Sequence, residues 1–514
     1  MQIRAILFVA LCLFGTGQLL STPEDDYYWA GVVEFDYKNK NSDSPEAYTE
    51  KSLDKYKEII YSKDADPVDI IVFPEYGISS GETSSFVPDP RERITPCNNL
   101  EYTKSLRDLS CMARDRQKYL VVNHAEKAMC PFPGDTRLCA PDELYHFNTN
   151  VVFDRQGMVI ARYRKYNLFG EAGMNVTVLP DLTVFDTDFG VRFGTFICFD
   201  LMFEQPALEL VRNGVRDFVY PTMWFSELPF LTAVQIQQAW AYANDVNFLA
   251  SGSNLPEIGS TGTGVFAGKQ GRIVSVMNHI GEQKLYVAKV PKRDRPTATV
   301  EKQPPHKFTP SQMSTLKLKR DQIDSYATAD IPLESNDNYK VTLCQNLLCC
   351  NFTLDYTVTK PSSGQPYYRY KVAVSDVKRT FDGFADGQIT SCAIFACSGD
   401  GMDRCAVRFE DPSRVVPAVR FNRIEIDGDF PGGDDVFLVP NNVDTSILPL
   451  DVEEIEYEKA DINRDGKNFK SIQYRLVTPR SDLLTFAIWG RKFVISRALN
   501  PTPSFISTSL RDEF

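Results

Sequence analysis

The sequence has few histidines, no excess of positive charge and no long apolar run. Only four of its 514 residues are histidine, at positions 124, 146, 279 and 306, which is a weak basis for a zinc or haem site. Acidic residues outnumber basic ones, 68 to 56, so the clustered positive charge of a nucleic-acid-binding surface is not expected. No apolar run approaches the roughly 20 residues that a membrane-spanning helix needs. We therefore expect no metal, no cofactor, no nucleic acid partner and no membrane span.

The amino-terminal segment has the three parts of a secretory signal peptide. Arg4 precedes the short apolar run Ala5–Phe14, and small residues follow at positions 15–17. We predict a signal peptide over residues 1–22 and a secreted, extracellular protein.

Two further features bear on that route. The sequons at Asn175 and Asn351 are candidate N-glycosylation sites. The final residues, 501–514, contain no hydrophobic tail, so no signal for a GPI anchor is seen. Whether the terminal Arg-Asp-Glu-Phe affects retention stays open.

The cysteine count indicates one unpaired thiol. Cys12 lies in the predicted signal peptide, so the mature chain keeps 11 of the 12 cysteines, an odd number in an oxidising compartment. Cys198 stands alone in the apolar run 193–200, which we predict to be a buried strand, and is either a small hydrophobe or a functional thiol. The other ten form two even clusters, each expected to form disulfides internally with open connectivity: Cys97, Cys111, Cys130 and Cys139, then Cys344, Cys349, Cys350, Cys392, Cys397 and Cys405.

Strand and helix patterns alternate from about residue 28 to residue 290. Trp29–Phe35, Asp69–Phe73 and Asp217–Tyr220 are strand candidates. A helix is predicted to begin at Ser44 and Pro45, and another is predicted over Glu204–Val215. This alternation predicts an α/β domain, which we place at residues 23–300.

The pattern changes beyond residue 300. Residues 301–335 contain several prolines and lysines and are predicted to form a linker. From residue 336 to residue 514, short β-branched and aromatic runs alternate with turn residues. We predict a second, β-rich accessory domain there.

Three reactive side chains follow the ends of predicted strands: Glu75, Lys165 and Cys198. Catalytic groups of α/β enzymes gather at such carboxyl ends. A thiol nucleophile needs a base that takes its proton, and Glu75 is the candidate for general base and later acid. Lys165, with the backbone N–H of Phe199, is the candidate for stabilising the oxyanion of a tetrahedral intermediate. The sequence therefore predicts a thiol-dependent acyl-transfer enzyme.

The order and flanks of these residues resemble the nitrilase superfamily of carbon–nitrogen hydrolases. Additional segments resemble its biotinidase and vanin branch. The segments that carry the resemblance are PEYG at 74–77, YRKYNLFGE at 163–171, FGTFICFD at 193–200, YPTMW at 220–224, QQAWA at 237–241 and GSTGTG at 259–264.

This resemblance implies a four-layer α-β-β-α sandwich followed by an accessory domain of the vanin type. It implies a catalytic triad of Glu75, Lys165 and Cys198, with Glu171 as a second carboxylate that positions the substrate or the lysine. The implied reaction is hydrolysis of a linear, non-peptide amide through a thioester acyl-enzyme. The implied substrate is a small vitamin-linked amide, pantetheine or biocytin.

Two alternatives stay open. One is a secreted binding or signalling protein that keeps the fold without needing catalysis. The other is acyl transfer to an amine in place of water. The oligomeric state is not predicted.

Overall fold

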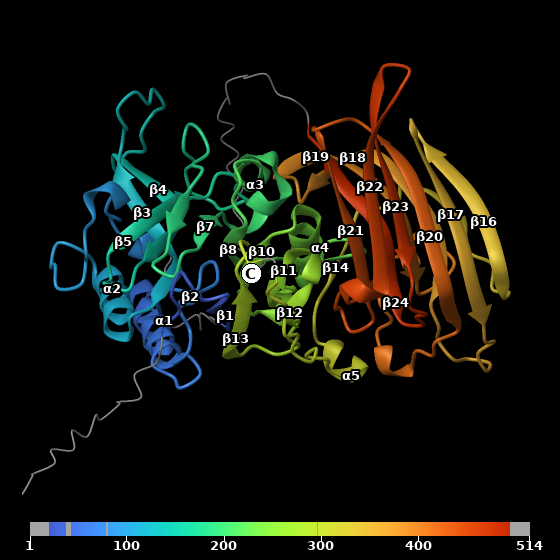
Figure 1. Ribbon diagram of the computed structural model, residues 1–514, viewed down its shortest axis with the longest axis horizontal. Coiled ribbons are helices and arrows are strands. Elements are labelled where there is room, and N and C mark those ends of the chain that lie inside the picture. Colours follow the sequence, from blue (N-terminus) through green and yellow to red (C-terminus); the bar gives the residue numbers. More distant parts are fainter. Residues whose placement is uncertain (1–19, 37–42, 79–80, 296, 494–514) are drawn as a thin grey trace, which may run out of the picture.

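The computed structural model describes residues 20–36, 43–78, 81–295 and 297–493. Most of the predicted signal peptide, including Cys12, and the tail 501–514 lie outside these residues. Figure 1 shows two bodies side by side, an amino-terminal one with helices and a carboxyl-terminal one made almost wholly of strands.

The amino-terminal domain is built on two six-stranded sheets. The first sheet has the order β13-β1-β2-β3-β4-β5 and the second the order β12-β11-β10-β8-β7-β6. The strands are β1 (Tyr27–Phe35), β2 (Ile70–Val72), β3 (Tyr119–Met129), β4 (Leu144–Phe153), β5 (Val159–Arg164), β6 (Val184–Asp186), β7 (Arg192–Thr195), β8 (Asp217–Thr222), β10 (Asn247–Gly252), β11 (Thr263–Ala267), β12 (Arg272–Val276) and β13 (Gln283–Pro291).

Helices cover the outer faces of both sheets. Helices α1 (Pro45–Ile60) and α2 (Lys104–Arg116) pack against the first sheet through an apolar cluster. Helices α3 (Glu209–Arg212) and α4 (Ala233–Asn244) pack against the second. A separate core between the sheets is made of β-branched, alanine and aromatic side chains from both. This arrangement confirms the expected four-layer α-β-β-α sandwich.

The start of α1 follows from its sequence. The Ser44 hydroxyl accepts a hydrogen bond of 3.2 Å from the Ala47 backbone N–H, and Pro45 occupies the first turn. A side-chain cap and a proline without an N–H both suit a helix start. The predicted helix start is confirmed.

Two predicted elements are wrong in part. Glu204–Val215 is not one regular helix, because Glu204–Leu208 forms a π-helical turn and α3 ends at Arg212. Pro206 lacks an N–H and disfavours helical geometry at Gln205, whose φ and ψ are −109° and 133°. The strand predicted over 193–200 ends at Thr195, and Cys198 opens a short 3-10 helix, Cys198–Met202.

The carboxyl-terminal domain is a sandwich of two five-stranded antiparallel sheets, which confirms the expected β-rich composition. One sheet has the order β15-β18-β19-β24-β21 and the other the order β16-β17-β20-β23-β22. The strands are β15 (Ala327–Asp330), β16 (Asn336–Gln345), β17 (Leu348–Val358), β18 (Arg369–Phe381), β19 (Ala385–Cys397), β20 (Val419–Pro431), β21 (Val436–Asp444), β22 (Ile455–Arg464), β23 (Lys467–Leu476) and β24 (Leu483–Lys492).

The described cysteines pair as their clustering predicts. Cys198 is buried and is the free cysteine of this part of the chain. The bridge from Cys350 on β17 to Cys392 on β19 joins the two sheets of the carboxyl-terminal domain. Every disulfide stays within its cluster: Cys97–Cys111, Cys130–Cys139, Cys344–Cys349, Cys350–Cys392 and Cys397–Cys405.

Helix α4 lies between the second sheet and the carboxyl-terminal domain (Figure 1). Its Gln235 amide donates to Asn441 at 2.7 Å, and its Gln238 amide donates to the Leu450 carbonyl at 2.7 Å. A glutamine in a helix can bury its stem and still satisfy its amide in this way. The two domains therefore share a hydrogen-bonded interface along α4.

The region predicted as a linker contains a short helix, α5 (Pro310–Met313), and β14 (Lys319–Arg320). Strand β14 pairs in parallel with β9 (Glu227–Leu228) of the amino-terminal domain. The domain boundaries themselves stay predictions. Within the described ranges, no helix combines the length and apolar character needed to cross a membrane.

Candidate active site

The three predicted catalytic residues lie just beyond the ends of strands in the two facing sheets. Glu75 follows β2, Lys165 follows β5 and Cys198 follows β7. All three are buried, with relative exposures of 1%, 1% and 6%. Buried ionisable groups at strand ends are characteristic of a catalytic site, whereas surface carboxylates and lysines are solvated.

Lys165 lies between two carboxylates. Its Nζ is 2.8 Å from Glu75 Oε1 and 2.5 Å from Glu171 Oε1. Burial lowers the pKa of Lys165, but Glu171 and Glu75 outweigh burial and hold that pKa well above its usual value. The side chain is therefore an ammonium ion in the resting protein.

Glu75 is fixed by donors from two other segments. Asn148 on β4 donates to Oε1 at 2.7 Å, and the Met223 backbone N–H donates to Oε2 at 2.8 Å. Asn148 also lies 3.4 Å from Glu171 Oε1. Sequence reasoning missed Asn148, which is one of several polar residues in β4.

Glu171 closes the turn that follows Lys165. Its Oε2 accepts a hydrogen bond from the Phe169 backbone N–H, while its Oε1 faces Lys165. The same carboxylate thus orders the turn and contacts the lysine, which agrees with the positioning role implied by the family resemblance. That role stays a prediction.

Cys198 occupies a tight turn between β7 and the 3-10 helix. Its φ is 46°, a left-handed value that costs energy for a residue with a Cβ and is found at functional turns. The Tyr220 hydroxyl donates to the Cys198 carbonyl at 2.8 Å, and the thiol lies 3.5 Å from the Met223 carbonyl. The backbone of Met223 therefore contacts both the thiol and Glu75, through its carbonyl and its N–H.

Electrostatics keep this thiol protonated at rest. Burial raises the pKa of Cys198 well above its usual value, and Glu75 raises it further, while Lys165 opposes them. A protonated thiol is a weak nucleophile and needs a base at the moment of attack.

Asp200 joins the turn of the cysteine to the turn of the lysine. Its carboxylate accepts hydrogen bonds from the Ile197 N–H at 3.0 Å, the Tyr163 hydroxyl at 2.7 Å and the Asn167 N–H at 2.8 Å. Burial raises the pKa of Asp200 to about 6. Sequence reasoning gave Asp200 no role.

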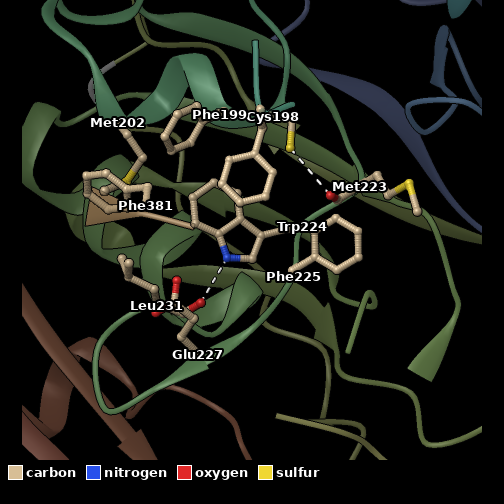
Figure 2. Close-up of a pocket in the computed structure, with 10 residues that line it drawn as sticks. Cys198, Phe199, Met202, Met223, Trp224, Phe225, Glu227, Leu231 and Phe381 are labelled. Atoms are coloured by element: carbon tan, nitrogen blue, oxygen red, sulfur yellow. Dashed lines mark hydrogen bonds between the residues drawn. The ribbon is translucent and has the colours of Figure 1, made fainter. Parts of the chain in front are cut away.

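A pocket opens beside Cys198 (Figure 2). The free space in it and at its open mouth is about 350 Å³, and its walls are mainly apolar. Phe199, Trp224 and Phe225 line it from the amino-terminal domain, and Phe381 lines it from β18 of the carboxyl-terminal domain. Such a mainly apolar hollow with a few polar groups is the usual form of a small-molecule site.

The predicted glycosylation sites lie outside this pocket. Asn351 is exposed, and its Oδ1 accepts a hydrogen bond of 2.7 Å from the Thr342 hydroxyl. Asn175 is half-buried, and its Oδ1 accepts from the His146 N–H at 2.8 Å. Both sites remain predictions.

Comparison with known families gives the lineage. Residues 42–295 match the family model described as carbon-nitrogen hydrolase, and residues 316–495 match the one described as Vanin C-terminal domain. The chain belongs to the vanin branch of the carbon–nitrogen hydrolases. It is 41% identical to vanin-like protein 1 of Drosophila melanogaster, over 96% of this chain and 90% of that protein.

Named enzymes of the branch are also similar. Pantetheinase of Bos taurus is 30% identical, over 91% of this chain and 89% of that protein. Biotinidase of Homo sapiens is 32% identical, over 71% of this chain and 73% of that protein. The expected family is thereby confirmed, and the chain is an amidohydrolase of the nitrilase superfamily, acting on carbon–nitrogen bonds other than peptide bonds.

Proposed function

We propose that this vanin-branch protein hydrolyses a linear amide through a thioester on Cys198, with Glu75 as general base and acid and Lys165 as oxyanion stabiliser. The observation that carries the proposal is the contact of Lys165 Nζ with Glu75 at 2.8 Å, beside a buried thiol. A base, a cation and a nucleophile enclosed together suit acyl transfer.

The first half of the reaction forms the acyl-enzyme. The Cys198 sulfur attacks the amide carbonyl carbon as Glu75 takes the thiol proton. The carbonyl electron pair moves to oxygen, and Lys165 with the Phe199 backbone N–H stabilises the resulting oxyanion. Collapse breaks the carbon–nitrogen bond, Glu75 returns the proton to nitrogen, and the amine leaves.

The second half releases the acid. Glu75 takes a proton from water as the water oxygen attacks the thioester carbonyl carbon. The same two donors stabilise the second oxyanion. Its collapse breaks the carbon–sulfur bond, and the sulfur recovers the proton from Glu75. Glu171 and Asn148 orient Lys165 and Glu75 throughout.

The substrate class comes from the relatives. Pantetheinases and biotinidases are among the proteins similar to this chain. We infer that the substrate is a small vitamin-linked amide, with pantetheine and biocytin as the first compounds to test.

We further propose that the protein acts outside the cell. The five disulfides among the described residues fit an oxidising compartment. Ser21 and Thr22, within the predicted signal peptide, take part in the fold, since the Ser21 hydroxyl donates to Asp69 at 2.6 Å and Lys292 donates to the Thr22 carbonyl at 2.6 Å. These contacts favour signal cleavage before Ser21, and amino-terminal sequencing of the secreted protein tests it.

Substrate profiling tests the catalytic proposal. The purified chain is incubated with pantetheine, biocytin and simple secondary amides, and acid and amine products are quantified together. Cys198→Ala should abolish turnover while leaving the thermal unfolding temperature nearly unchanged. Absence of turnover by the wild type on every amide would favour the binding role, and amide products formed with added amines would instead identify acyl transfer.

A further inference from the structure

The carboxyl-terminal domain reaches into the pocket beside Cys198. Phe381, the last residue of β18, lines the same hollow as Cys198 and Trp224. In the view of Figure 2, Phe381 and Cys198 lie on either side of the Phe199 ring. A residue far along the chain thus forms part of the wall of the pocket that Cys198 also lines.

Phe381 is held rigidly in this wall. Its side chain is 2% exposed, and its ring meets the Phe199 ring edge-on, with centroids 5.5 Å apart. The guanidinium groups of Arg379 and Arg491 lie 4.4 Å and 4.9 Å from its centroid. Cations over an aromatic ring and a perpendicular aromatic neighbour are both attractive arrangements. The ring is therefore a fixed boundary of the pocket.

The same segment holds a carboxylate at the pocket. Arg379 Nη2 lies 3.1 Å from Glu227 Oε2, and Arg379 also pairs with Asp321. Glu227 lines the pocket, on the far side of the Trp224 indole from Cys198 in Figure 2. Burial raises the pKa of Glu227 to about 7, Asp321 adds to this effect and Arg379 opposes it. Arg379 of the carboxyl-terminal domain thus pairs with Glu227 of the amino-terminal domain. The Glu227 carboxylate is a hydrogen-bond acceptor at the pocket.

The chemistry decides which part of the substrate meets this wall. Once the thioester has formed, the acyl group is bonded to Cys198, itself a wall residue, whereas the amine has left. Water must then enter from the mouth while the acyl group stays in place. The acyl group, bonded to Cys198, therefore occupies the pocket that Cys198 lines.

We propose that Phe381 of the carboxyl-terminal domain is a specificity-determining residue that limits the width of the acyl group, and that Glu227 accepts a hydrogen bond from a donor on that group. The inference rests on the proposed amidase function. It assigns as substrates amides whose acyl chain is narrow where it passes Phe381 and carries a hydrogen-bond donor such as a hydroxyl or an amide N–H. The accessory domain is then part of the substrate site.

The test uses the amide that the wild-type chain hydrolyses best. Analogues keep its amine and change its acyl group, either by adding one methyl branch or by removing the hydrogen-bond donor. Phe381→Ala should raise the ratio of kcat/KM for the branched over the parent substrate about 10-fold or more, since a pocket discriminates one methyl group by about that factor. Phe381→Leu should raise it less.

Glu227→Gln should change the preference between the parent substrate and the analogue that lacks the hydrogen-bond donor. In assays at pH 8, where Glu227 is mainly ionised, the preference for the donor-bearing acyl group should fall about 10-fold, because a hydrogen bond to a charged acceptor is replaced by a weaker one to a neutral acceptor. The preference against the branched group should stay as in the wild type.

Phe486→Leu is the matched control. Phe486 is a buried phenylalanine of the same domain, stacked on Tyr474 with centroids 4.0 Å apart, and it does not line this pocket. It should lower the unfolding temperature and leave both substrate ratios unchanged.

The possible results distinguish failure of the proposed amidase function from failure of the roles assigned to Phe381 and Glu227. Failure of the wild type to hydrolyse any amide overturns the proposed function. If the wild type is active but Phe381→Ala leaves the ratio of kcat/KM for the branched over the parent substrate unchanged, the role of Phe381 alone is overturned. Phe381→Leu decides this point if the alanine variant does not fold. Unmoved donor preference in Glu227→Gln overturns the role of Glu227.

Discussion

The Tyr163 hydroxyl donates a hydrogen bond of 2.7 Å to the Asp200 carboxylate, and both side chains are fully buried. Tyr163 is on β5, two residues before Lys165, and Asp200 is two residues after Cys198. This contact fixes the strand of the lysine against the turn of the nucleophile. The relative position of two candidate catalytic groups thus depends on a contact between residues close to each of them in the chain.

Tyr163→Phe removes that hydrogen bond and a longer one, which the hydroxyl accepts from the Tyr166 N–H at 3.3 Å. We expect kcat to fall about 10-fold while KM changes little, because small misplacements of catalytic groups cost rate. The loss of a hydrogen bond to a buried carboxylate should cost about 2 kcal/mol of stability. Steady-state kinetics and denaturant unfolding measure the two effects.

Tyr28→Phe is its matched control. Tyr28 is another buried tyrosine, and it donates to the buried Asp217 at 2.9 Å in the core between the sheets. A similar loss of stability with unchanged kcat is expected there. Equal losses of kcat in both variants would show that Tyr163 acts only through stability.

Glu171→Gln leaves Lys165 with one carboxylate in place of two. We expect kcat to fall about 10- to 100-fold, and Glu75→Gln to lower it further, by roughly 1,000-fold, because only Glu75 transfers protons. Asp69→Asn provides the comparison, since it breaks a buried pair with Arg155 that lies 2.8 Å away at the opposite end of β2. Asp69→Asn should destabilise the protein and spare kcat; an equal fall in kcat would contradict a specific role for Glu171.

Native thiol labelling should modify Cys198 and no other cysteine of the mature chain. The five disulfides leave it as the free cysteine among the described residues. Since burial raises the pKa of this thiol, the alkylation rate should increase about 10-fold per pH unit between pH 6 and 9. Peptide mapping after iodoacetamide treatment checks both statements, and a different labelled cysteine would refute the first.

Glu34 makes stability depend on pH. Burial raises the pKa of this β1 carboxyl to about 8, although Thr261 and Gly262 donate hydrogen bonds to it. The folded protein then keeps a proton that the unfolded chain releases near pH 4.5, so this contribution is fully present below pH 4.5 and is lost as pH rises toward 8. Its loss amounts to roughly 5 kcal/mol.

Glu34→Gln should flatten that dependence, because the neutral amide cannot release a proton. Unfolding free energies of wild type and variant, measured from pH 5 to pH 8, give the comparison. The exposed Glu257→Gln should retain the wild-type slope. An unchanged slope in Glu34→Gln would mean that Glu34 is ionised in the folded protein.

Much of the site was predictable from local sequence. Glu75, Lys165 and Cys198 follow apolar strands, and their flanks resemble one superfamily, so their candidate roles needed no coordinates. Asn148 and Asp200 were missed because a polar residue beside an apolar run gives no sign of its partner. The contacts of Met223 could not be predicted, because they use its backbone N–H and carbonyl, which every residue type except proline has.

The local errors have equally local causes. Hydrophobic spacing predicted one helix over Glu204–Val215, but Pro206 forces its neighbour out of helical geometry. An apolar run predicted a strand through Cys198. Hydrophobicity indicates that a segment is buried, but it does not predict the positive φ of Cys198 that ends the strand geometry.

The sequence by itself determined the family, the strand–helix alternation, the β-rich second domain and the odd cysteine, because these depend on local pattern and on counting. Only the tertiary structure decided that Lys165 lies between two carboxylates and that Phe381 shares a pocket with Cys198. Both facts follow from which strand ends and which domain surfaces meet. Such contacts join residues far apart in the chain, and no local pattern encodes them.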